Sequence, residues 1–291
     1  MLNRNLELFI KVAEYGSITK VAKAFYITQP AVSNAISKLE NELGIKLFFR
    51  DKRNGLMLTD VGKQILTYAK QMEDIDNRIY QSAYKEKNLL GGRVRIAVLT
   101  SLVSTILSKA LKEYRMLYPE IDIEIKEGTP NDIFTMIEDH SADFAVSCSP
   151  FGKFQSITLV HDCIMAIFPR NNKEKNTVTL SNPPDTLIIN KPAYETILDH
   201  ITQRDSVKFD KVILVQNAET AINMVADEIG VGIISKYTLN TLAPNYPKYS
   251  VIPKISFDIG LFANDLKDLT PAAFEFVRII QKTSVPLVHN R

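Results

Sequence analysis

GSITKVAKAFYITQPAVSNAISKLENEL, residues 16–43, predicts two short helices joined by a tight turn. The first has apolar residues at spacings of three and four, which share one helical face. They are Ile18, Val21, Ala22 and Phe25. Ser17 or Thr19 is expected to cap this helix. Pro30 suits the first turn of the next helix, because backbone N–H groups there have no hydrogen-bond partner within the helix. The second helix is expected to bury Val32, Ile36, Leu39 and Leu43.

The opposite face of the second helix is small, polar and almost uncharged. It carries Pro30, Ser33, Asn34, Ser37 and Asn41. A helix that enters the DNA major groove needs short hydrogen-bonding side chains near its N-terminus, while flanking Lys and Arg contact phosphates. Two amphipathic helices are also an ordinary packing unit, so the surrounding sequence has to decide between these interpretations.

The flanking residues predict a third helix and a hairpin. The helix precedes the opening stretch and has an apolar face of Leu6, Phe9, Ile10 and Ala13. After Gly44, residues 45–49 and 56–58 read as two short strands around a charged tip, residues 50–55. The tip is either a solvated turn or a wing whose cations hold phosphates or enter the minor groove.

A long helix is predicted from an N-cap at Thr59-Asp60 to about Asn88, with a length of roughly 45 Å at 1.5 Å per residue. Its apolar residues alternate in steps of four and three, which indicates a heptad seam. The seam consists of Val61, Ile65, Tyr68, Met72, Ile75 and Ile79. We expect it to pair with a second copy of the chain; the alternative is packing against the C-terminal domain. Gly91-Gly92 reads as a linker.

From Arg93 onward strands alternate with helices, which predicts an α/β fold with largely parallel sheets. The expected strands are residues 94–99, 121–125, 143–147, 163–169, 187–189, 212–215, 231–234 and 259–262. The expected helices are residues 106–117, 133–137, 194–201, 219–228 and 271–281.

Composition excludes several classes of protein. At 45% apolar and 23% charged, with no apolar run near the roughly 20 residues that span a bilayer, the chain reads as a cytoplasmic protein without a membrane segment or secretory signal. Two cysteines, Cys148 and Cys163, and four histidines predict neither a disulfide framework nor a metal site. Residues 1–92 carry 14 Lys and Arg against 10 Asp and Glu, and the remainder 21 against 23. This basic N-terminal part is compatible with nucleic-acid binding.

These elements together resemble the LysR-type transcriptional regulators over nearly the whole chain. The most specific stretch is QPAVSNAISKLENELGIKLFFRDKRNGLMLTDVGKQIL, residues 29–66, followed by the long helix, the glycine linker and RVRIAV, residues 93–98. Weaker similarities lie at residues 118–119, 128–129, 143–146 and 227–233. Two departures are Val21, where the family usually has alanine, and Ser235, where it often has proline.

The resemblance implies an α+β multidomain fold: a winged helix-turn-helix (1–58), a linker helix for dimerisation (59–92) and a two-subdomain effector domain (93–291) similar to periplasmic solute-binding proteins. The chain would cross between subdomains near His161-Asp162 and near Asn264-Asp265. Subdomain I would then comprise about 93–161 and 266–291, and subdomain II about 162–265. The implied partners are double-stranded DNA with an inverted repeat and RNA polymerase. The chain would form a homodimer, and in this family two such dimers commonly form a tetramer.

For DNA, Gln29 and Ser33 are the expected readers of base edges, because both lie at the start of the recognition helix. Thr28 and Pro30 begin that helix, and Asn34, Ser37 and Lys38 would follow the DNA backbone. The wing would contribute Arg50, Lys52 and Arg53. Each of these charged residues is otherwise an ordinary solvated group.

For the effector, polar residues that follow predicted strands are expected to surround a small and anionic molecule between the subdomains. From the first half these are Thr100, Ser101, Thr129, Ser147 and Cys148; from the second half Asn190, Lys191, Asn217 and Glu219. Lys191 would supply a counter-charge. Each of these residues is equally well explained as a helix cap, and Cys148 as buried packing rather than a redox sensor.

Two other functions use the same α/β cleft: a solute-binding module, and an enzyme. No nucleophile elbow, phosphate-binding glycine loop, metal-ligand spacing or acid–base pair supports an enzyme. The sequence therefore predicts a DNA-binding regulator without a cofactor.

Overall fold

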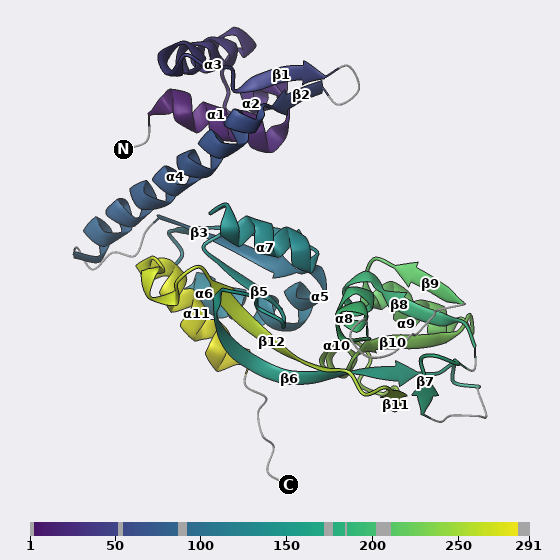
Figure 1. Cartoon of the computed structure of the whole chain (residues 1–291). Coiled ribbons are helices and arrows are strands. Elements are labelled where there is room, and N and C mark those ends of the chain that lie inside the picture. Colours follow the sequence, from purple (N-terminus) through teal and green to yellow (C-terminus); the bar gives the residue numbers. More distant parts are fainter. Residues whose placement is uncertain are drawn as a thin grey trace. The chain divides into compact units, whose positions relative to one another are not determined.

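The computed structural model describes residues 3–51, 55–86, 92–171, 177–183, 185–201 and 211–284. Its contacts divide the chain into two compact units, residues 1–92 with 138–141, and residues 93–137 with 142–291 (Figure 1). In the part of the chain described, no helix is both long and apolar enough to cross a membrane.

The first unit contains four helices and a hairpin among its described residues: α1 Arg4–Tyr15, α2 Ile18–Ala24, α3 Gln29–Leu43, β1 Phe48–Asp51, β2 Gly55–Leu58 and α4 Asp60–Glu86. Ser17, not Thr19, caps α2, and its Oγ accepts the N–H of Lys20. The predicted core residues Phe9, Val21 and Val32 are buried. Leu43 is 43% exposed, contrary to the prediction, because Gly44 ends α3 beside it in a left-handed conformation.

The start of α4 confirms the predicted N-cap. Thr59 Oγ1 accepts the N–H of Gly62 at 2.9 Å and donates to the carbonyl of Lys46 at 2.8 Å. A Cβ on Gly62 would lie 2.2 Å from the carbonyl oxygen of Leu47. Only glycine therefore lets the helix start this close to the residue before β1.

The second unit contains two α/β subdomains. Subdomain I contains β3 Gly92–Leu99, α5 Thr100–Leu102, the π-helix η1 Val103–Leu107, α6 Ser108–Leu117, β4 Ile121–Gly128, α7 Pro130–Glu138, β5 Phe144–Cys148, β12 Ser256–Ala263, the 3-10 helix η2 Leu266–Asp268 and α11 Pro271–Ser284. Subdomain II contains β7 Val178–Thr179, β8 Leu187–Asn190, α8 Lys191–Ile201, β9 Val212–Val215, α9 Ala218–Ala226, β10 Val231–Ser235, α10 Lys236–Leu242 and β11 Tyr249–Ile252.

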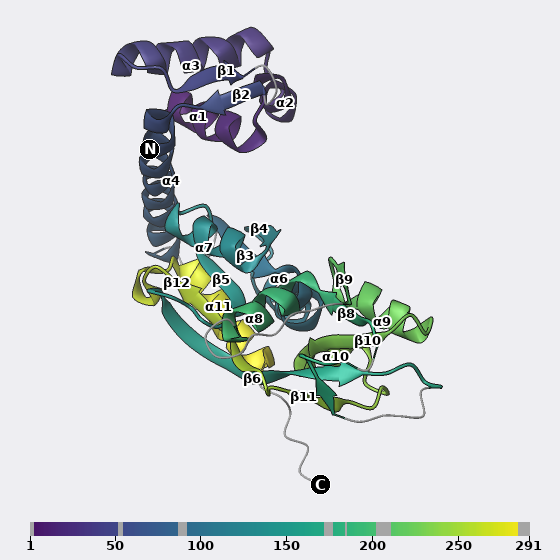
Figure 2. The same ribbon diagram turned by 45° about the vertical axis from the view of Figure 1, so that its right-hand side comes forward.

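The long strand β6, Gln155–Ile167, joins the two subdomains, as both views of the ribbon show (Figure 2). The strand order is β4-β3-β5-β12-β6-β10-β8-β9. The pairs β3–β5, β8–β9 and β8–β10 are parallel, whereas β12 and β6 run antiparallel to their neighbours. Each half therefore has the predicted parallel pairs, and antiparallel strands connect the halves.

Of the two places where the chain was expected to cross between the subdomains, one lies close to its predicted position and the other does not. In β6 the pairing changes from β12 to β10 between Cys163 and Ile164, next to the expected point. The return lies near the start of β12, not at Asn264-Asp265, because residues 259–262 already pair with β5. The sequence analysis also missed residues 155–162 of β6 and the short elements β7, α10 and β11, although Ile157 and Leu159 alternate with the exposed Ser156 and Thr158.

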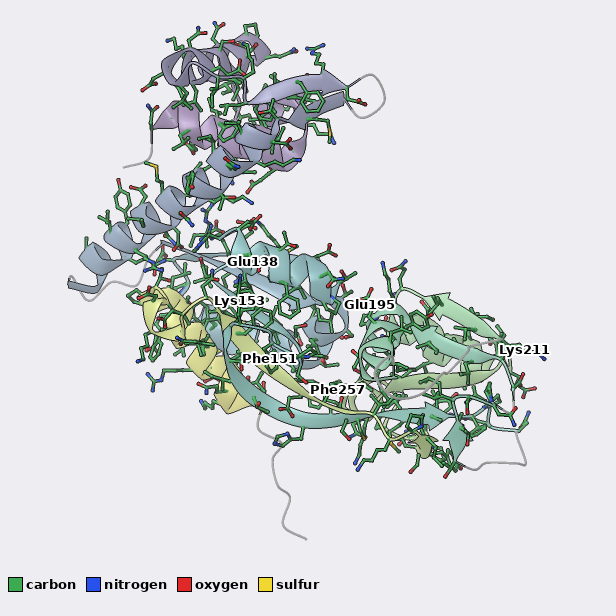
Figure 3. All side chains as sticks on the ribbon, in the orientation of Figure 1. Glu138, Phe151, Lys153, Glu195, Lys211 and Phe257 are labelled. Carbon is green, nitrogen blue, oxygen red and sulfur yellow. The ribbon has the colours of Figure 1, made fainter. Side chains whose placement is uncertain are left out.

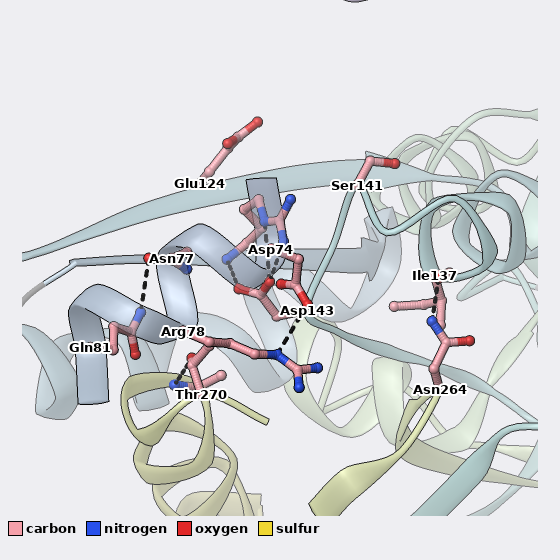
Figure 4. Close-up of polar contacts among 12 residues, drawn as sticks. Asp74, Asn77, Arg78, Gln81, Glu124, Ile137, Ser141, Asp143, Asn264 and Thr270 are labelled. Atoms are coloured by element: carbon pink, nitrogen blue, oxygen red, sulfur yellow. Dashed lines mark hydrogen bonds and ion pairs between the residues drawn. The ribbon is translucent and has the colours of Figure 1, made fainter. Parts of the chain in front are cut away.

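Buried contacts fix subdomain I. Arg95 and Asp143 form an ion pair of 2.7 Å in which both side chains are 3% exposed. The ring of Tyr114 on α6 stacks on Phe276 of α11 at 4.2 Å. Asn264 Nδ2 donates to the carbonyl of Ile137 at 2.6 Å, so the end of β12 is held to α7 (Figure 4).

Candidate DNA-binding surface and effector cleft

The N-terminal half of α3 presents a polar, exposed face. Thr28 caps the helix, and its Oγ1 accepts the N–H of Ala31 at 3.4 Å. The candidate residues on this helix are all exposed: Thr28, Gln29, Pro30, Ser33, Asn34, Ser37 and Lys38. Because Val32 and Ile36 on the other face are buried, the apolar side fixes the helix and its polar side is left for a partner.

A surface cavity of about 360 Å³ connects this face to the hairpin. It is lined by Gly16, Ser17, Ile18, Thr19, Gln29, Arg50, Asp51 and Leu56. Arg50 on β1 therefore lines the same cavity as Gln29, whereas Lys52 and Arg53 lie outside the described residues. Thr19 is exposed there and was not among the predicted contacts; only packing of α2 against α3 brings it near Gln29, so no local pattern reveals it.

Glu40 links α3 to the start of the hairpin. Its carboxylate is 7% exposed, receives Lys46 Nζ at 2.6 Å and accepts the N–H of Leu47 at 2.9 Å. Burial raises the Glu40 pKa, but the hydrogen bonds from Lys46, Leu47 and Phe48 outweigh burial and leave that pKa below its ordinary value. Hydrogen bonds to the Glu40 carboxylate thus hold α3 to the start of β1.

The heptad seam of α4 is largely exposed. The exposed fractions are 45% for Val61, 62% for Tyr68, 51% for Met72, 56% for Ile75 and 59% for Ile79. Ile65 is the exception, because it packs on the core of the first unit. A row of exposed large apolar side chains is the pattern of a surface that another chain covers.

A narrow cavity of about 20 Å³ lies where the two subdomains of the second unit meet. Its lining comes from both: Leu99, Ser101, Leu102, Cys148, Phe257 and Ile259 from subdomain I, and Ile164, Asn190, Pro192, Ala193, Thr196, Ile234, Ser235 and Thr238 from β6 and subdomain II. Phe257 lies on β12 at the junction (Figure 3). Three of the predicted effector residues, Ser101, Cys148 and Asn190, are brought together here.

The other predicted effector residues do not line this cavity. Ser147 is buried, with its Oγ unpaired among the described residues, while Thr100, Lys191 and Glu219 are exposed. Asn217 caps α9, and its Oδ1 accepts the N–H of Thr220 at 2.8 Å. This is the capping alternative that the sequence left open.

Thr129 caps α7 together with Asp132. Thr129 donates its N–H and its hydroxyl to Asp132 Oδ2 at 2.9 Å and 2.7 Å. These two hydrogen bonds hold the pKa of Asp132 below its ordinary value, and the charge of Lys191 lowers it further.

The crossing strands carry a second polar cluster. Asp162 on β6 is 7% exposed and accepts hydrogen bonds from Ser235 Oγ at 2.6 Å and from the N–H of Tyr237 at 3.0 Å. His161 Nδ1 lies 2.6 Å from Asp258 Oδ1. Of these residues, His161, Asp162 and Asp258 line a separate open cavity of about 440 Å³. Ser235, a departure from the family pattern, therefore has a structural role at the crossing.

The surroundings of Cys148 favour the protonated thiol. Burial raises the pKa of the Cys148 thiol, and the nearby charge of Asp162 raises it further. A raised pKa disfavours the nucleophilic thiolate. Among the described residues, no three His, Cys, Asp or Glu side chains are grouped closely enough to hold a metal ion.

Comparisons with known families and proteins agree with this architecture. Residues 3–63 match the bacterial regulatory helix-turn-helix protein of the lysR family, and residues 87–284 match the LysR substrate binding domain. The chain is 39% identical over 285 residues to the uncharacterized HTH-type transcriptional regulator YoaU of Bacillus subtilis (strain 168), covering 97% of this chain and 98% of the relative.

Solved structures of low identity share the fold. A full-length OxyR variant from Pseudomonas aeruginosa has a TM-score of 0.71 at 16% identity, covering 96% of this chain and 93% of that one. The LysR family transcriptional regulator CbnR has a TM-score of 0.60 at 16% identity, covering 98% and 99%. The related sequences are transcriptional regulators and not enzymes. This chain belongs to the LysR family of transcriptional regulators, with an N-terminal DNA-binding helix-turn-helix and a C-terminal effector-binding domain.

Proposed function

We propose that the protein binds an inverted-repeat DNA site as a homodimer and that a small anionic effector, held between its C-terminal subdomains, controls this binding. The observation that carries the proposal is the exposed polar half of α3 with Arg50 beside it. A solved complex of full-length CbnR with its target DNA has the same fold, with a TM-score of 0.60. The protein acts where promoter DNA lies, in the cytoplasm.

The DNA contacts divide by chemistry. Gln29 and Ser33 read base edges, because amide and hydroxyl groups at a helix start reach the major-groove edges of bases. Asn34, Ser37 and Lys38 follow the phosphates, and Thr28 and Pro30 orient the helix. Arg50, Lys52 and Arg53 neutralise phosphates from the wing.

Dimerisation uses the α4 seam. Two copies of the exposed row from Val61 to Ile79 bury each other and hold two α3 helices at a fixed spacing, which requires two half-sites. Pairing of such dimers gives a tetramer, and RNA polymerase is the further partner of a regulator bound at a promoter.

The effector cleft supplies hydroxyls and a cation. Thr100 and Ser101 start the continuous helical segment α5–η1–α6, and Leu99 before them makes no side-chain cap, so backbone N–H groups remain for an anion. Lys191 supplies the counter-charge, and Thr129, Ser147, Cys148, Asn190, Asn217 and Glu219 complete the proposed set.

Footprinting and fluorescence anisotropy on DNA upstream of the protein's own and adjacent genes test the DNA-binding proposal. Gln29→Ala and Ser33→Ala are each expected to weaken specific binding by about 1–3 kcal/mol. Asn41→Ala is the matched control, because Asn41 is exposed near the other end of α3. Unchanged promoter binding by the Gln29→Ala, Ser33→Ala double variant would refute the assigned readers.

The effector proposal is tested by repeating the footprint with candidate metabolites. The Thr100→Ala, Ser101→Ala double variant is expected to bind DNA normally and to lose its response to the active metabolite. A full response in this variant would place the effector elsewhere.

A further inference from the structure

One buried polar atom in the cavity between the subdomains has no partner. Asn190, at the end of β8, is 4% exposed, lines the cavity, and its Oδ1 is hydrogen-bonded to no described residue. Most buried polar atoms in folded proteins are paired, because an unpaired one loses its hydration without compensation. An unpaired acceptor that lines a cavity therefore points to a group supplied by a ligand.

The neighbouring polar side chains are already engaged. Thr196 Oγ1 donates to the carbonyl of Pro192 at 3.0 Å. Ser235 Oγ lies 2.6 Å from Asp162 Oδ2 and 3.1 Å from Thr238 Oγ1. Of the polar side chains lining the cavity, only those of Asn190, Ser101 and Cys148 make no hydrogen bond to another described residue, so few groups are left for a ligand.

The interior of this cavity does not suit a charge. None of its fourteen lining residues among those described is Asp, Glu, Lys, Arg or His, and eight of them are apolar. The carboxylate of Asp162 lies directly behind Ser235. An anionic group placed inside would lose its hydration next to this carboxylate and gain no counter-charge.

We propose, resting on the effector site proposed above, that the effector inserts an uncharged hydrogen-bond donor, a hydroxyl or amide N–H, which donates to Asn190 Oδ1. Its carbon atoms contact Leu102, Ile164 and Phe257. The anionic group stays at the mouth near Lys191. A cavity of about 20 Å³ holds little more than one water-sized group, so the donor ends a short chain.

The first test needs no ligand. Asn190→Leu replaces the unpaired amide with an apolar side chain of similar size and is expected to raise Tm by about 2–6 °C. Asn217→Leu is the matched control and is expected to lower Tm, because Asn217 caps α9. A fall in Tm for Asn190→Leu comparable to the control overturns the proposal. If that variant does not fold, Asn190→Ala is compared with Asn217→Ala, and the proposal requires the smaller loss at Asn190.

The second test uses matched probes: propionate, butyrate and valerate, each beside its terminally hydroxylated and terminally aminated analogue. At about 10 mM, the hydroxylated member of at least one set should raise the Tm of the wild-type protein more than the other two. This preference should disappear in Asn190→Leu. A preference for the unsubstituted or aminated member, or no shift with any hydroxylated probe, overturns the proposal.

Both tests measure the stability of the full chain without DNA. Failure of the wild-type protein to bind promoter DNA would refute the proposed regulatory function and leave these Tm comparisons unaffected. The two failures are therefore distinguishable.

Discussion

Ser235 Oγ donates a hydrogen bond of 2.6 Å to Oδ2 of Asp162, which joins the start of α10 to the strand that crosses between the subdomains. Burial raises the pKa of Asp162, and hydrogen bonds from Ser235, Cys163 and Tyr237 oppose this without cancelling it. A buried carboxylate at a crossing strand makes the stability of this region depend on pH.

The sign of that dependence follows from the raised pKa. The pKa of Asp162 is higher in the folded protein than its ordinary value of 3.8, so the folded state binds this proton more tightly than the unfolded state does. Ionisation of Asp162 therefore lowers the stability of the folded protein as pH rises through the folded pKa. Asp162→Asn does not ionise. The Tm of this variant minus that of the wild type is expected to become more positive as pH rises above 3.8, measured by thermal unfolding. A constant or falling difference would contradict the raised pKa.

Glu40 is expected to make stability depend on pH in the opposite direction. Its lowered pKa contributes stability that is present above the ordinary value of 4.5 and is lost as pH falls through the folded pKa. At neutral pH the free energy of unfolding of Glu40→Gln should therefore be lower than that of the wild type by about 1.5–3 kcal/mol, the contribution of a charged hydrogen bond. This difference in stability should disappear at acidic pH. Glu42→Gln, exposed on the same helix, is the control. If the difference in stability persisted below the folded pKa of Glu40, side-chain packing and not its charge would be the cause.

The buried ion pair of subdomain I should be far more sensitive than a surface pair. Asp143→Asn removes the buried carboxylate that pairs with Arg95 and is expected to lower the free energy of unfolding by about 3–5 kcal/mol. Glu275→Gln, which breaks the exposed pair with Arg278, should change it by less than about 1 kcal/mol. Urea unfolding followed by circular dichroism measures both, and equal effects would rule out this account.

The α4 seam should determine association. Ile75→Glu places a carboxylate in the centre of the proposed interface and is expected to weaken dimerisation by at least about tenfold. Lys63→Gln changes an exposed residue off the seam and is the control. Sedimentation equilibrium measures the two dissociation constants. A dimer of unchanged affinity in Ile75→Glu would show that another surface joins the protomers.

Cys148 should react slowly with thiol reagents. Its raised pKa leaves little thiolate at neutral pH. Mass spectrometry after timed exposure to iodoacetamide is expected to show slower alkylation of Cys148 in the folded protein than in urea. Labelling at the unfolded rate would reopen the redox-sensor alternative.

Local patterns were sufficient to identify most elements. The N-cap at Thr59, the seam of α4 and the strands β3, β8 and β9 follow from capping and periodicity, which depend on residues a few positions apart. The first half of β6 was missed, because the alternation of Ile157 and Leu159 with exposed Ser156 and Thr158 covers only four residues. Ser235 read only as a departure from the family pattern, and its bond to Asp162 spans 73 residues.

The sequence alone determined the family, the recognition helix and its exposed polar face, because each depends on short-range order along the chain. Only the tertiary structure decided which candidate effector residues meet. In the tertiary structure Asn190, Ser101 and Cys148 line one cavity, and Asn217 caps α9. Asp162 lies outside this cavity and accepts a hydrogen bond from Ser235, which lines it. The physical reason is that burial and the pairing of polar atoms depend on strands brought together from distant parts of the sequence.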